Sequence, residues 1–433
     1  MEYRYRDASE MKDSGVEWIG KIPKDISIKR LKYDLVFQKG NNPREINNEG
    51  KGIPYIGASD FGSKKYSQYT TDINLPICIE EDLLILWDGA RAGIVDYGHK
   101  GAISSTVVKV ENKNNLFLKK YYNWYMKSFE KYFVDMSNGT TIPHMNRKFL
   151  ENLLILEIPL KEQRKIVNFL DKKTSEFDSI ISKKEALIEK LEEAKKSLIS
   201  EVITGKVKVV KTDDGYDLVK RSSDEMKDSG VEYIGYIPND WKISRIKNFT
   251  ILKSIKNKPH LELLSLYREY GVVPKSSRDD NNNRPSEDLS GYKYVQVNDL
   301  VLNKMKVWQG SLAISKYEGI VSPAYIICGI DIEKMKPMYV HYLLRNKLYI
   351  PEYRRLSTGI RPGQWDMNYD NFKNIKAVIP STQEQGIIIK YLDEKINNID
   401  NLVIIIKQQI EKLKEAKHSL ISEAVTGKIE ILD

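Results

Sequence analysis

Two polar, glycine-containing segments occupy the same place in the two halves of the chain. They are residues 137–146, Ser-Asn-Gly-Thr-Thr-Ile-Pro-His-Met-Asn, and residues 357–366, Ser-Thr-Gly-Ile-Arg-Pro-Gly-Gln-Trp-Asp. Their hydroxyl, amide, imidazole and guanidinium groups are donors and acceptors that match the edges of DNA bases. We therefore predict nucleic-acid contacts in both segments, with a tight solvated turn as the alternative. The candidate residues are Thr140, Thr141, His144, Asn146, Arg361 and Gln364.

A second pair of segments lies upstream of the first in each half. Residues 87–91, Trp-Asp-Gly-Ala-Arg, correspond to residues 308–311, Trp-Gln-Gly-Ser. We expect the tryptophan to pack inward in both, while Arg91 and Gln309 could reach DNA; a plain hairpin turn is an equal alternative. Cationic loops elsewhere could hold phosphates, although solvated surface loops would look the same. These cationic candidates are Lys64, Lys65, Arg278 and Arg284.

No motif in the chain indicates catalytic chemistry. Residues 204–206 and 426–428, both Thr-Gly-Lys, superficially suggest phosphate loops, but they lack the upstream glycine and the following Ser or Thr. Glycine at these positions is typical of a helix C-terminus. The five histidines have no metal-ligand spacing to one another or to carboxylates. We therefore expect a protein that is not an enzyme, with no metal and no cofactor.

The chain contains a tandem duplication whose frame is repeated and whose middle differs. Residues 11–17, Met-Lys-Asp-Ser-Gly-Val-Glu, recur as residues 226–232. Each half also closes on Ser-Leu-Ile-Ser-Glu, at residues 197–201 and 419–423. Repeats this far apart are domains, because solenoid units have periods of roughly 20–50 residues. One architecture that presents two different recognition surfaces is the simplest interpretation.

Composition favours a polyanionic partner. The 433 residues carry a formal net charge of +9, and the sequence pI is about 9.0. Nucleic acid is the commonest partner of such a basic chain; a basic protein without a polyanionic partner is the alternative. The two cysteines, Cys78 and Cys328, do not suggest a disulfide framework. We find neither an apolar signal segment nor a membrane-spanning run, and we expect a cytoplasmic location with no membrane contact.

Each half is predicted to be a β-rich segment followed by one long helix, which gives an α+β fold. Short apolar runs that end in turn signals indicate strands, for example at residues 83–87, 106–110, 294–297 and 325–327. One helix is expected to interrupt the strands of each half, at about residues 118–132 and 338–348. We expect residues 208–220, which are rich in Lys and Asp, to form an exposed linker.

Residues 161–203 contain neither Gly nor Pro and have the spacing of a coiled-coil helix. The partner segment, about residues 383–425, has the same spacing. We predict that the two helices pair with each other and are antiparallel. The expected seam is Phe177, Ile180, Leu187, Leu191, Ala194, Leu198 and Val202 against Ile399, Leu402, Ile406, Gln409, Leu413, Ala416 and Leu420.

Taken together, the repeated segments resemble the DNA specificity subunit (HsdS) of type I restriction–modification systems over essentially the whole chain. The most specific parts are the Met-Lys-Asp-Ser-Gly-Val-Glu-(Trp/Tyr)-Ile-Gly segments, the helix ends, and residues 158–167, Ile-Pro-Leu-Lys-Glu-Gln-Arg-Lys-Ile-Val. The resemblance implies target recognition domains at 1–158 and 221–379, coiled-coil helices at 159–207 and 380–433, and a linker at 208–220.

The resemblance also implies a function without catalysis. Each recognition domain would read half of a bipartite, asymmetric site on double-stranded DNA, and the paired helices would hold the two readers apart. Methyltransferase subunits would clasp the helices, and an ATP-dependent restriction subunit would complete the complex. The alternative from a different class is a coiled-coil adaptor whose β-rich domains bind proteins.

Overall fold

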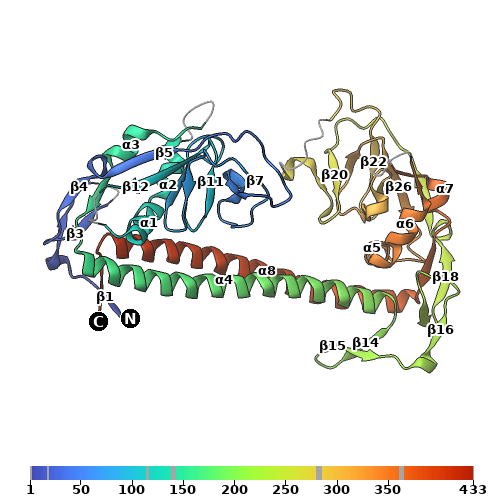
Figure 1. Cartoon of the computed structure of the whole chain (residues 1–433). Helices are drawn as coiled ribbons and strands as arrows, with labels where there is room; N and C mark the ends of the chain where they lie inside the picture. The colour runs from blue at the N-terminus through green and yellow to red at the C-terminus, as the bar shows by residue number, and fades with distance from the viewer. Residues whose placement is uncertain are drawn as a thin grey trace. The chain divides into compact units, whose positions relative to one another are not determined.

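The computed structural model describes residues 2–16, 19–113, 117–137, 143–278, 285–359 and 365–432. The chain divides into two compact units. Unit 1 contains residues 1–185 and 407–433, and unit 2 contains residues 186–406. Each unit therefore combines one β-rich half of the chain with a part of each long helix, as Figure 1 illustrates.

Unit 1 is built around an antiparallel sheet with the strand order β10-β9-β12-β5. Its strands β9 and β12 are buried because their apolar side chains have neighbours on both faces. A second sheet has the order β7-β6-β11-β8, in which only β6 and β11 run parallel. The strands are β5 (Leu35–Lys39), β9 (Leu83–Leu86), β10 (Val95–Asp96), β12 (Val107–Asn112), β6 (Ile53–Ile56), β7 (Tyr69–Thr70), β8 (Ile77–Cys78) and β11 (Gly101–Ile103).

The central sheet of unit 2 repeats the order found in unit 1, although the two sequences hardly match there. Its order is β24-β23-β26-β19, all antiparallel. Smaller antiparallel pairs complete the unit. The elements are β19 (Thr250–Lys253), β23 (Leu300–Asn303), β24 (Leu312–Ile314), β26 (Tyr325–Ile330), with the pairs β20 (Leu264–Tyr267) and β21 (Gly271–Pro274), β22 (Lys293–Val295) and β25 (Gly319–Val321), β18 (Lys242–Arg245) and β29 (Lys376–Ile379), and β16 (Met226–Asp228) and β17 (Tyr236–Pro238).

Short helices follow the strands, and both expected single helices are divided in two. In unit 1, the Ser128 hydroxyl donates to Tyr125 O and the Phe129 N–H to Met126 O, which tightens the turn and ends the first helix. In unit 2, Asn346 accepts a hydrogen bond from Leu348 N and starts a new turn. The helices are α1 (Lys119–Ser128), α2 (Glu130–Ser137), α3 (Arg147–Asn152), α5 (Pro337–Leu344), α6 (Ile350–Leu356) and α7 (Tyr369–Phe372).

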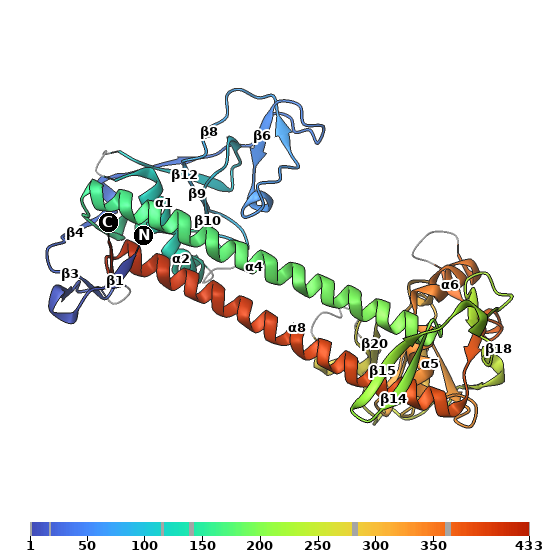
Figure 2. The same ribbon diagram turned by 90° about the horizontal axis from the view of Figure 1, so that it is seen from below.

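The two long helices are α4 (Leu160–Ile203) and α8 (Thr382–Val425), and they pair antiparallel in each unit (Figures 1 and 2). In unit 1, Lys417 Nζ lies 2.7 Å from Asp178 Oδ1, and Lys184 Nζ donates to Gln409 Oε1 at 2.7 Å. In unit 2, Lys195 Nζ lies 2.5 Å from Asp400 Oδ1. Residue numbers thus rise along α4 while they fall along α8, which confirms the predicted α+β fold and the antiparallel coiled coil.

The predicted seam is one residue out of register at several positions. Ile180 and Leu187 keep 44% and 45% of their surface exposed, and Ile181 and Ile188 turn inward in their place. On α8, Val403 and Ile410 are buried. A stripe of period 3.5 drifts around a helix of 3.6 residues per turn, so neighbouring apolar residues can exchange the inward place. The predicted seam residues that prove exposed are Ile180, Leu187, Ala194, Leu402, Gln409 and Ala416.

The ends of the long helices are glycine caps, as predicted. Gly205 and Gly427 have φ angles of +72° and +70°, which side-chain-bearing residues rarely adopt. A Cβ at Gly205 would lie 2.4 Å from Pro238 Cγ, and one at Gly427 would lie 2.8 Å from Pro23 Cγ. Each cap therefore also provides the space in which the start of a β-rich half packs.

The expected linker at residues 208–220 is folded. Strands β14 (Val207–Thr212) and β15 (Gly215–Lys220) form an antiparallel hairpin directly after α4. The equivalent place after α8 is taken by the two ends of the chain, because β30 (Ile429–Ile431) pairs with β1 (Tyr3–Tyr5). Beyond β1, unit 1 contains the antiparallel pairs β2 (Met11–Asp13) with β3 (Lys21–Pro23) and β4 (Ile28–Arg30) with β13 (Leu154–Leu156).

Candidate nucleic-acid interface

Unit 1 brings the two predicted polar segments into contact. The loop after β9 lies against residues 143–146, because Met145 N donates to Trp87 O at 2.8 Å and Gly89 N donates to Pro143 O at 3.0 Å. The Asp88 carboxylate then hydrogen-bonds the His144 ring at Nδ1. Segments that lie more than 50 residues apart in the sequence thus share one polar surface.

A small charge network orients the His144 ring. Lys39 Nζ, at the end of β5, lies 2.9 Å from Asp88 Oδ2. Burial alone would raise the pKa of Asp88, but the hydrogen bonds from Lys39 and His144 outweigh it and hold the pKa below its usual value. Because a carboxylate only accepts, His144 Nδ1 is the donor in the bond to Asp88. The His144 side chain is 53% exposed, so its ring is open to a ligand.

Asn146 and Arg91 have structural partners within unit 1. Asn146 Oδ1 accepts the backbone N–H groups of Lys148 and Phe149 and caps α3. Asn368 caps α7 of unit 2 in the same way, so this asparagine belongs to the common frame of the two units. The Arg91 guanidinium donates from Nη1 to Ala58 O at 2.6 Å and from Nη2 to Phe61 O at 3.4 Å.

Unit 2 makes the corresponding contact with different side chains. Met367 N donates to Lys304 O at 2.9 Å, and Lys304 Nζ lies 3.0 Å from Asp366 Oδ2. Here β28 (Asp366–Met367), which pairs with β27 (Ser357–Thr358), takes the place of residues 143–146. In unit 1 the acidic residue, Asp88, lies on the loop after β9. In unit 2 the loop after β23 carries the basic residue, Lys304, and the acidic residue, Asp366, lies on β28.

The expectation that both tryptophans pack inward is half correct. Trp87 is 8% exposed and belongs to the core of unit 1. Trp308 is only partly buried, and its ring meets Trp365 edge to face with centroids 5.3 Å apart. Gln309 ends the same short helical turn, Val307–Gln309, and is also partly exposed. Trp308 therefore packs against Trp365, the residue before Asp366, and Gln309 follows Trp308 in the chain.

The cationic candidates lie on other loops. Lys64 and Lys65 are exposed on the loop that follows β6, the loop whose carbonyls Arg91 holds. The Arg278 guanidinium lies 4.0 Å from the ring centroid of Tyr270, which is 60% exposed. Such a cation on an exposed aromatic ring suits a nucleic-acid surface. The candidates Thr140, Thr141, Arg284, Arg361 and Gln364 fall outside the described residues.

Within the described residues, no group of three or more His, Cys, Asp or Glu is placed to hold a metal ion. Likewise, no helix of the described part is long and apolar enough to cross a membrane. The two cysteines are free and buried, on β8 and β26, and burial raises their pKa values, to about 11 for Cys78 and about 12 for Cys328.

Comparisons with known proteins agree on one family. Residues 24–192 match the family model described as type I restriction modification DNA specificity domain. The MjaVIII specificity subunit of Methanocaldococcus jannaschii is 28% identical over 434 residues, covering 95% of this chain and 94% of that protein. The EcoBI specificity subunit of Escherichia coli is 20% identical, with 89% and 82% covered. A chain from a solved type I restriction–modification system shares the fold, with a TM-score of 0.65, 14% identity, and 94% and 99% covered.

Over 95% of its length the chain is similar to a type I restriction enzyme specificity subunit, and residues 24–192 match the DNA specificity domain of that family. These subunits are recognition components without catalysis, which agrees with the expectation that the chain is not an enzyme. The duplication of this chain repeats one frame around two β-rich halves whose loops differ.

Several residues of this polar surface were not among the sequence-based candidates. Asp88 lies in the segment 87–91, but nothing local indicated that it would orient His144. Trp365 and Asp366 lie in the segment 357–366, and the sequence indicated no role for either. The missing signal is the pairing of the loop after the central strand with the segment that returns to the long helix. The residues concerned are Lys39, Asp88, Lys304, Trp365 and Asp366.

Proposed function

We propose that the chain reads a bipartite, asymmetric DNA site, one half with each unit. The observation that carries this proposal is the paired polar surface beside the central sheet: Asp88 with His144 in unit 1, and Lys304 with Asp366 in unit 2. One backbone contact is common to both units, Met145 N to Trp87 O and Met367 N to Lys304 O, whereas the side chains differ in kind and in charge order. One scaffold with two chemistries is what a reader of two unlike half-sites requires.

In unit 1, His144 would contact a base edge. In the neutral ring with its proton on Nδ1, Nε2 would accept a hydrogen bond from the exocyclic amine of adenine or cytosine. In unit 2, the planar donor groups of Arg361 and Gln364 suit guanine and adenine, and Gln309 lies beside the same surface. Thr140 and Thr141 would add hydroxyl contacts in the first reader. Asn146 would act through the backbone that it caps.

Phosphate contacts would come from the cationic loops. Lys64 and Lys65 in unit 1, and Arg278 and Arg284 in unit 2, are the proposed anchors, in keeping with the net charge of +9. Lysine suits this task because it is a compact charge without the planar fork of arginine. Such contacts fix the position of the protein on the duplex and carry no sequence information.

The helix pair would separate the readers and bind the methyltransferase subunits. On α8, Leu402 and Ile405 lie three residues apart on one side and are 48% and 47% exposed; Leu187 on α4 is 45% exposed. Apolar residues at such positions suit the packing of partner helices. Leu402→Glu with Ile405→Glu should reduce co-purification with the methyltransferase subunit and leave DNA binding by the free chain unchanged. Unimpaired co-purification would place the docking surface elsewhere.

Methylation mapping tests the proposal directly. The chain is expressed with its companion methyltransferase, and modified positions are read from genomic DNA. We expect two different half-sites separated by an unspecified spacer. A palindromic target, or methylation without sequence preference, would contradict the proposal.

The helix pair as a spacer has its own test. One heptad inserted in both helices adds about 10 Å, because each residue contributes about 1.5 Å. At about 3.4 Å per base pair, the spacer should lengthen by about three base pairs. Both half-sites should stay the same, and an unchanged spacer would rule out this role of the helices.

A further inference from the structure

The loop that carries Lys64 and Lys65 is held in an unfavourable backbone conformation. Lys64 has a φ angle of +49°, in the left-handed region that residues other than glycine rarely adopt. Its side chain passes over Gly98, where an added Cβ would lie 2.5 Å from Lys64 Nζ. Such a conformation persists only when the surroundings determine it, and it often marks a functional position.

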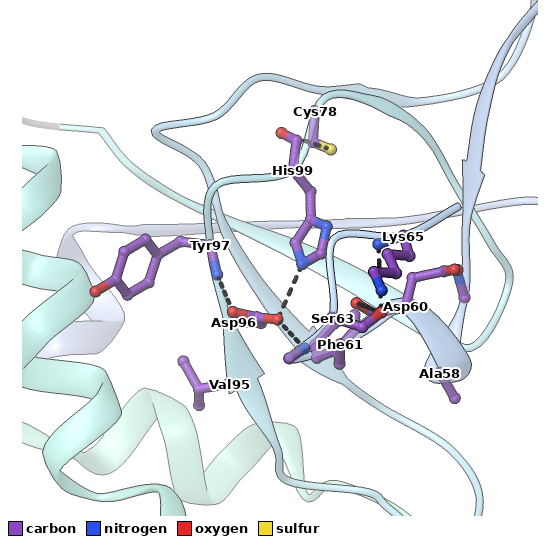
Figure 3. A network of polar contacts seen from close by, with 12 residues as sticks. Ala58, Asp60, Phe61, Ser63, Lys65, Cys78, Val95, Asp96, Tyr97 and His99 are labelled. Carbon is purple, nitrogen blue, oxygen red and sulfur yellow. Dashed lines mark hydrogen bonds and ion pairs between the residues drawn. The ribbon is translucent and has the colours of Figure 1, made fainter. Parts of the chain in front are cut away.

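A polar network around Asp96 and His99 holds this loop, as Figure 3 illustrates. Asp96 Oδ2 accepts the backbone N–H of Gly62 at 2.7 Å and also bonds His99 Nε2 at 2.9 Å. His99 is fully buried, and its Nδ1 lies 3.2 Å from the Tyr66 hydroxyl at the far end of the loop. The network fixes the residues on both sides of Lys64 and Lys65.

Arg91 holds the same loop by its carbonyl groups. Its two terminal nitrogens donate to Ala58 O and Phe61 O, one at each end of the turn that precedes Lys64. An arginine has a rigid planar fork, so it can bridge two carbonyls in a way that lysine cannot. Each terminal nitrogen of Arg91 thus directs one N–H at the protein, which leaves fewer donors for a bidentate contact with a base or phosphate.

Unit 2 holds the corresponding loop with an arginine from a different element. Leu263, just before β20, forms a parallel bridge to Ile320 of β25, as β6 does with β11 in unit 1. The loop after β20 contains Arg268, whose carbonyl accepts a hydrogen bond from Arg345 Nη2 at 2.5 Å. Arg345 Nη1 donates to Leu312 O at 2.9 Å. Arg91 follows β9, whereas Arg345 follows α5, so a similar contact is made from two places in the fold.

We propose that Arg91 is a positioning residue for DNA binding: it holds the loop of Lys64 and Lys65 in the conformation that anchors phosphate, and does not itself contact DNA. This inference rests on the proposed function. From the sequence, Arg91 is expected to reach DNA directly, and the inference gives it a positioning role instead.

The test is the salt dependence of DNA binding by the full chain. Affinity for a random-sequence DNA duplex is measured at several salt concentrations, and each lost phosphate contact lowers the slope of log K against log salt by about 0.9. Lys64→Ala with Lys65→Ala should therefore lower the slope by up to about 1.8. Arg91→Ala should lower it by a similar amount, and adding Arg91→Ala to the double lysine variant should lower it no further.

Two further variants separate geometry from charge. Arg91→Lys keeps the charge but cannot bridge the two carbonyls, so we expect it to lower the slope nearly as far as Arg91→Ala. Arg164→Ala removes an exposed arginine from α4 and should leave the slope unchanged. Thermal unfolding of each variant is measured in parallel.

The outcomes are distinct. If Arg91→Lys keeps the full slope, and Arg91→Ala lowers it further in the double lysine variant, Arg91 contacts phosphate itself and the inference is overturned. A lower melting temperature with an unchanged slope would make Arg91 a residue of the fold alone, and would overturn it too. If the double lysine variant keeps the full slope, there is no anchor to position; sequence-selective binding would then still support the proposed function. A wild-type chain that binds no DNA would overturn both.

Discussion

Tyr121 and Tyr122 are neighbours on α1, yet removal of their hydroxyl groups should have opposite effects. Both side chains are buried, with 0% and 3% of their surface exposed. The Tyr121 hydroxyl donates to Val425 O, in the last turn of α8, at 2.9 Å. The Tyr122 hydroxyl is buried without a hydrogen-bond partner among the described residues. The pair thus offers a test and a matched control within one helix.

The magnitudes follow from hydrogen-bond energetics. Tyr121→Phe removes a bond and leaves a buried carbonyl unsatisfied, which should cost about 1–2 kcal/mol. Tyr122→Phe removes a desolvated hydroxyl that has no partner, so it should be neutral or stabilising by about 1 kcal/mol. Both changes remove one phenolic oxygen. The difference between their effects on stability therefore measures the hydrogen bond to Val425 O.

Native-state hydrogen exchange, read by mass spectrometry on peptides of residues 117–137, is the appropriate assay. A chain of two units need not unfold in a single transition, and exchange reports on unit 1 alone. A loss of about 1.4 kcal/mol raises the exchange rate about tenfold. Faster exchange in Tyr121→Phe, with equal or slower exchange in Tyr122→Phe, is expected. Equal effects of the two substitutions would refute the reasoning.

Three further predictions concern a helix cap, a titrating group and a base contact. Gly427→Ala should destabilise unit 1 by more than about 1 kcal/mol, because the new Cβ meets Pro23 at a positive φ, and the same exchange assay measures this. Burial lowers the pKa of His341 from 6.5 to about 3 in the folded chain. Between about pH 6.5 and pH 3, His341 is therefore protonated in the unfolded chain but not in the folded one. Stability should therefore fall by about 1–2 kcal/mol from pH 7 to pH 5, and His341→Gln should flatten this dependence in denaturant titrations. Arg361→Ala should cost about 1–3 kcal/mol of DNA affinity and relax preference in the second half-site only, as binding to single-base variants would reveal; equal weakening on every sequence would make Arg361 an anchor.

The frame of the protein could be predicted from its sequence because the frame depends on local patterns. Repeated segments, glycine caps and the absence of Gly and Pro from residues 161–203 predicted two long helices and their pairing. The register of the seam was less predictable. Ile180 and Ile181 are adjacent and equally apolar, and only the packing of α8 decides which one turns inward.

The shared central sheet could not be predicted, because the matching strands of the two halves are both buried but differ in their residues. Strand β9, Leu-Leu-Ile-Leu, and strand β23, Leu-Val-Leu-Asn, occupy the same place with different residues. Side-chain partners were equally out of reach. Asp88 and His144 meet because the chain returns to the sheet after two helices, and no local pattern records such a contact.

The two halves are held to the helix pair by matching contacts, which explains why their loops are free to differ. Tyr339 in α5 donates to Ile203 O at the end of α4, as Tyr121 in α1 does to Val425 O at the end of α8. These contacts, like the glycine caps, involve the repeated segments and the buried faces of short helices. The loops after β9 and β23 take no part in them. A change of sequence in those loops therefore alters the polar surface of one unit and leaves the pairing of α4 with α8 intact.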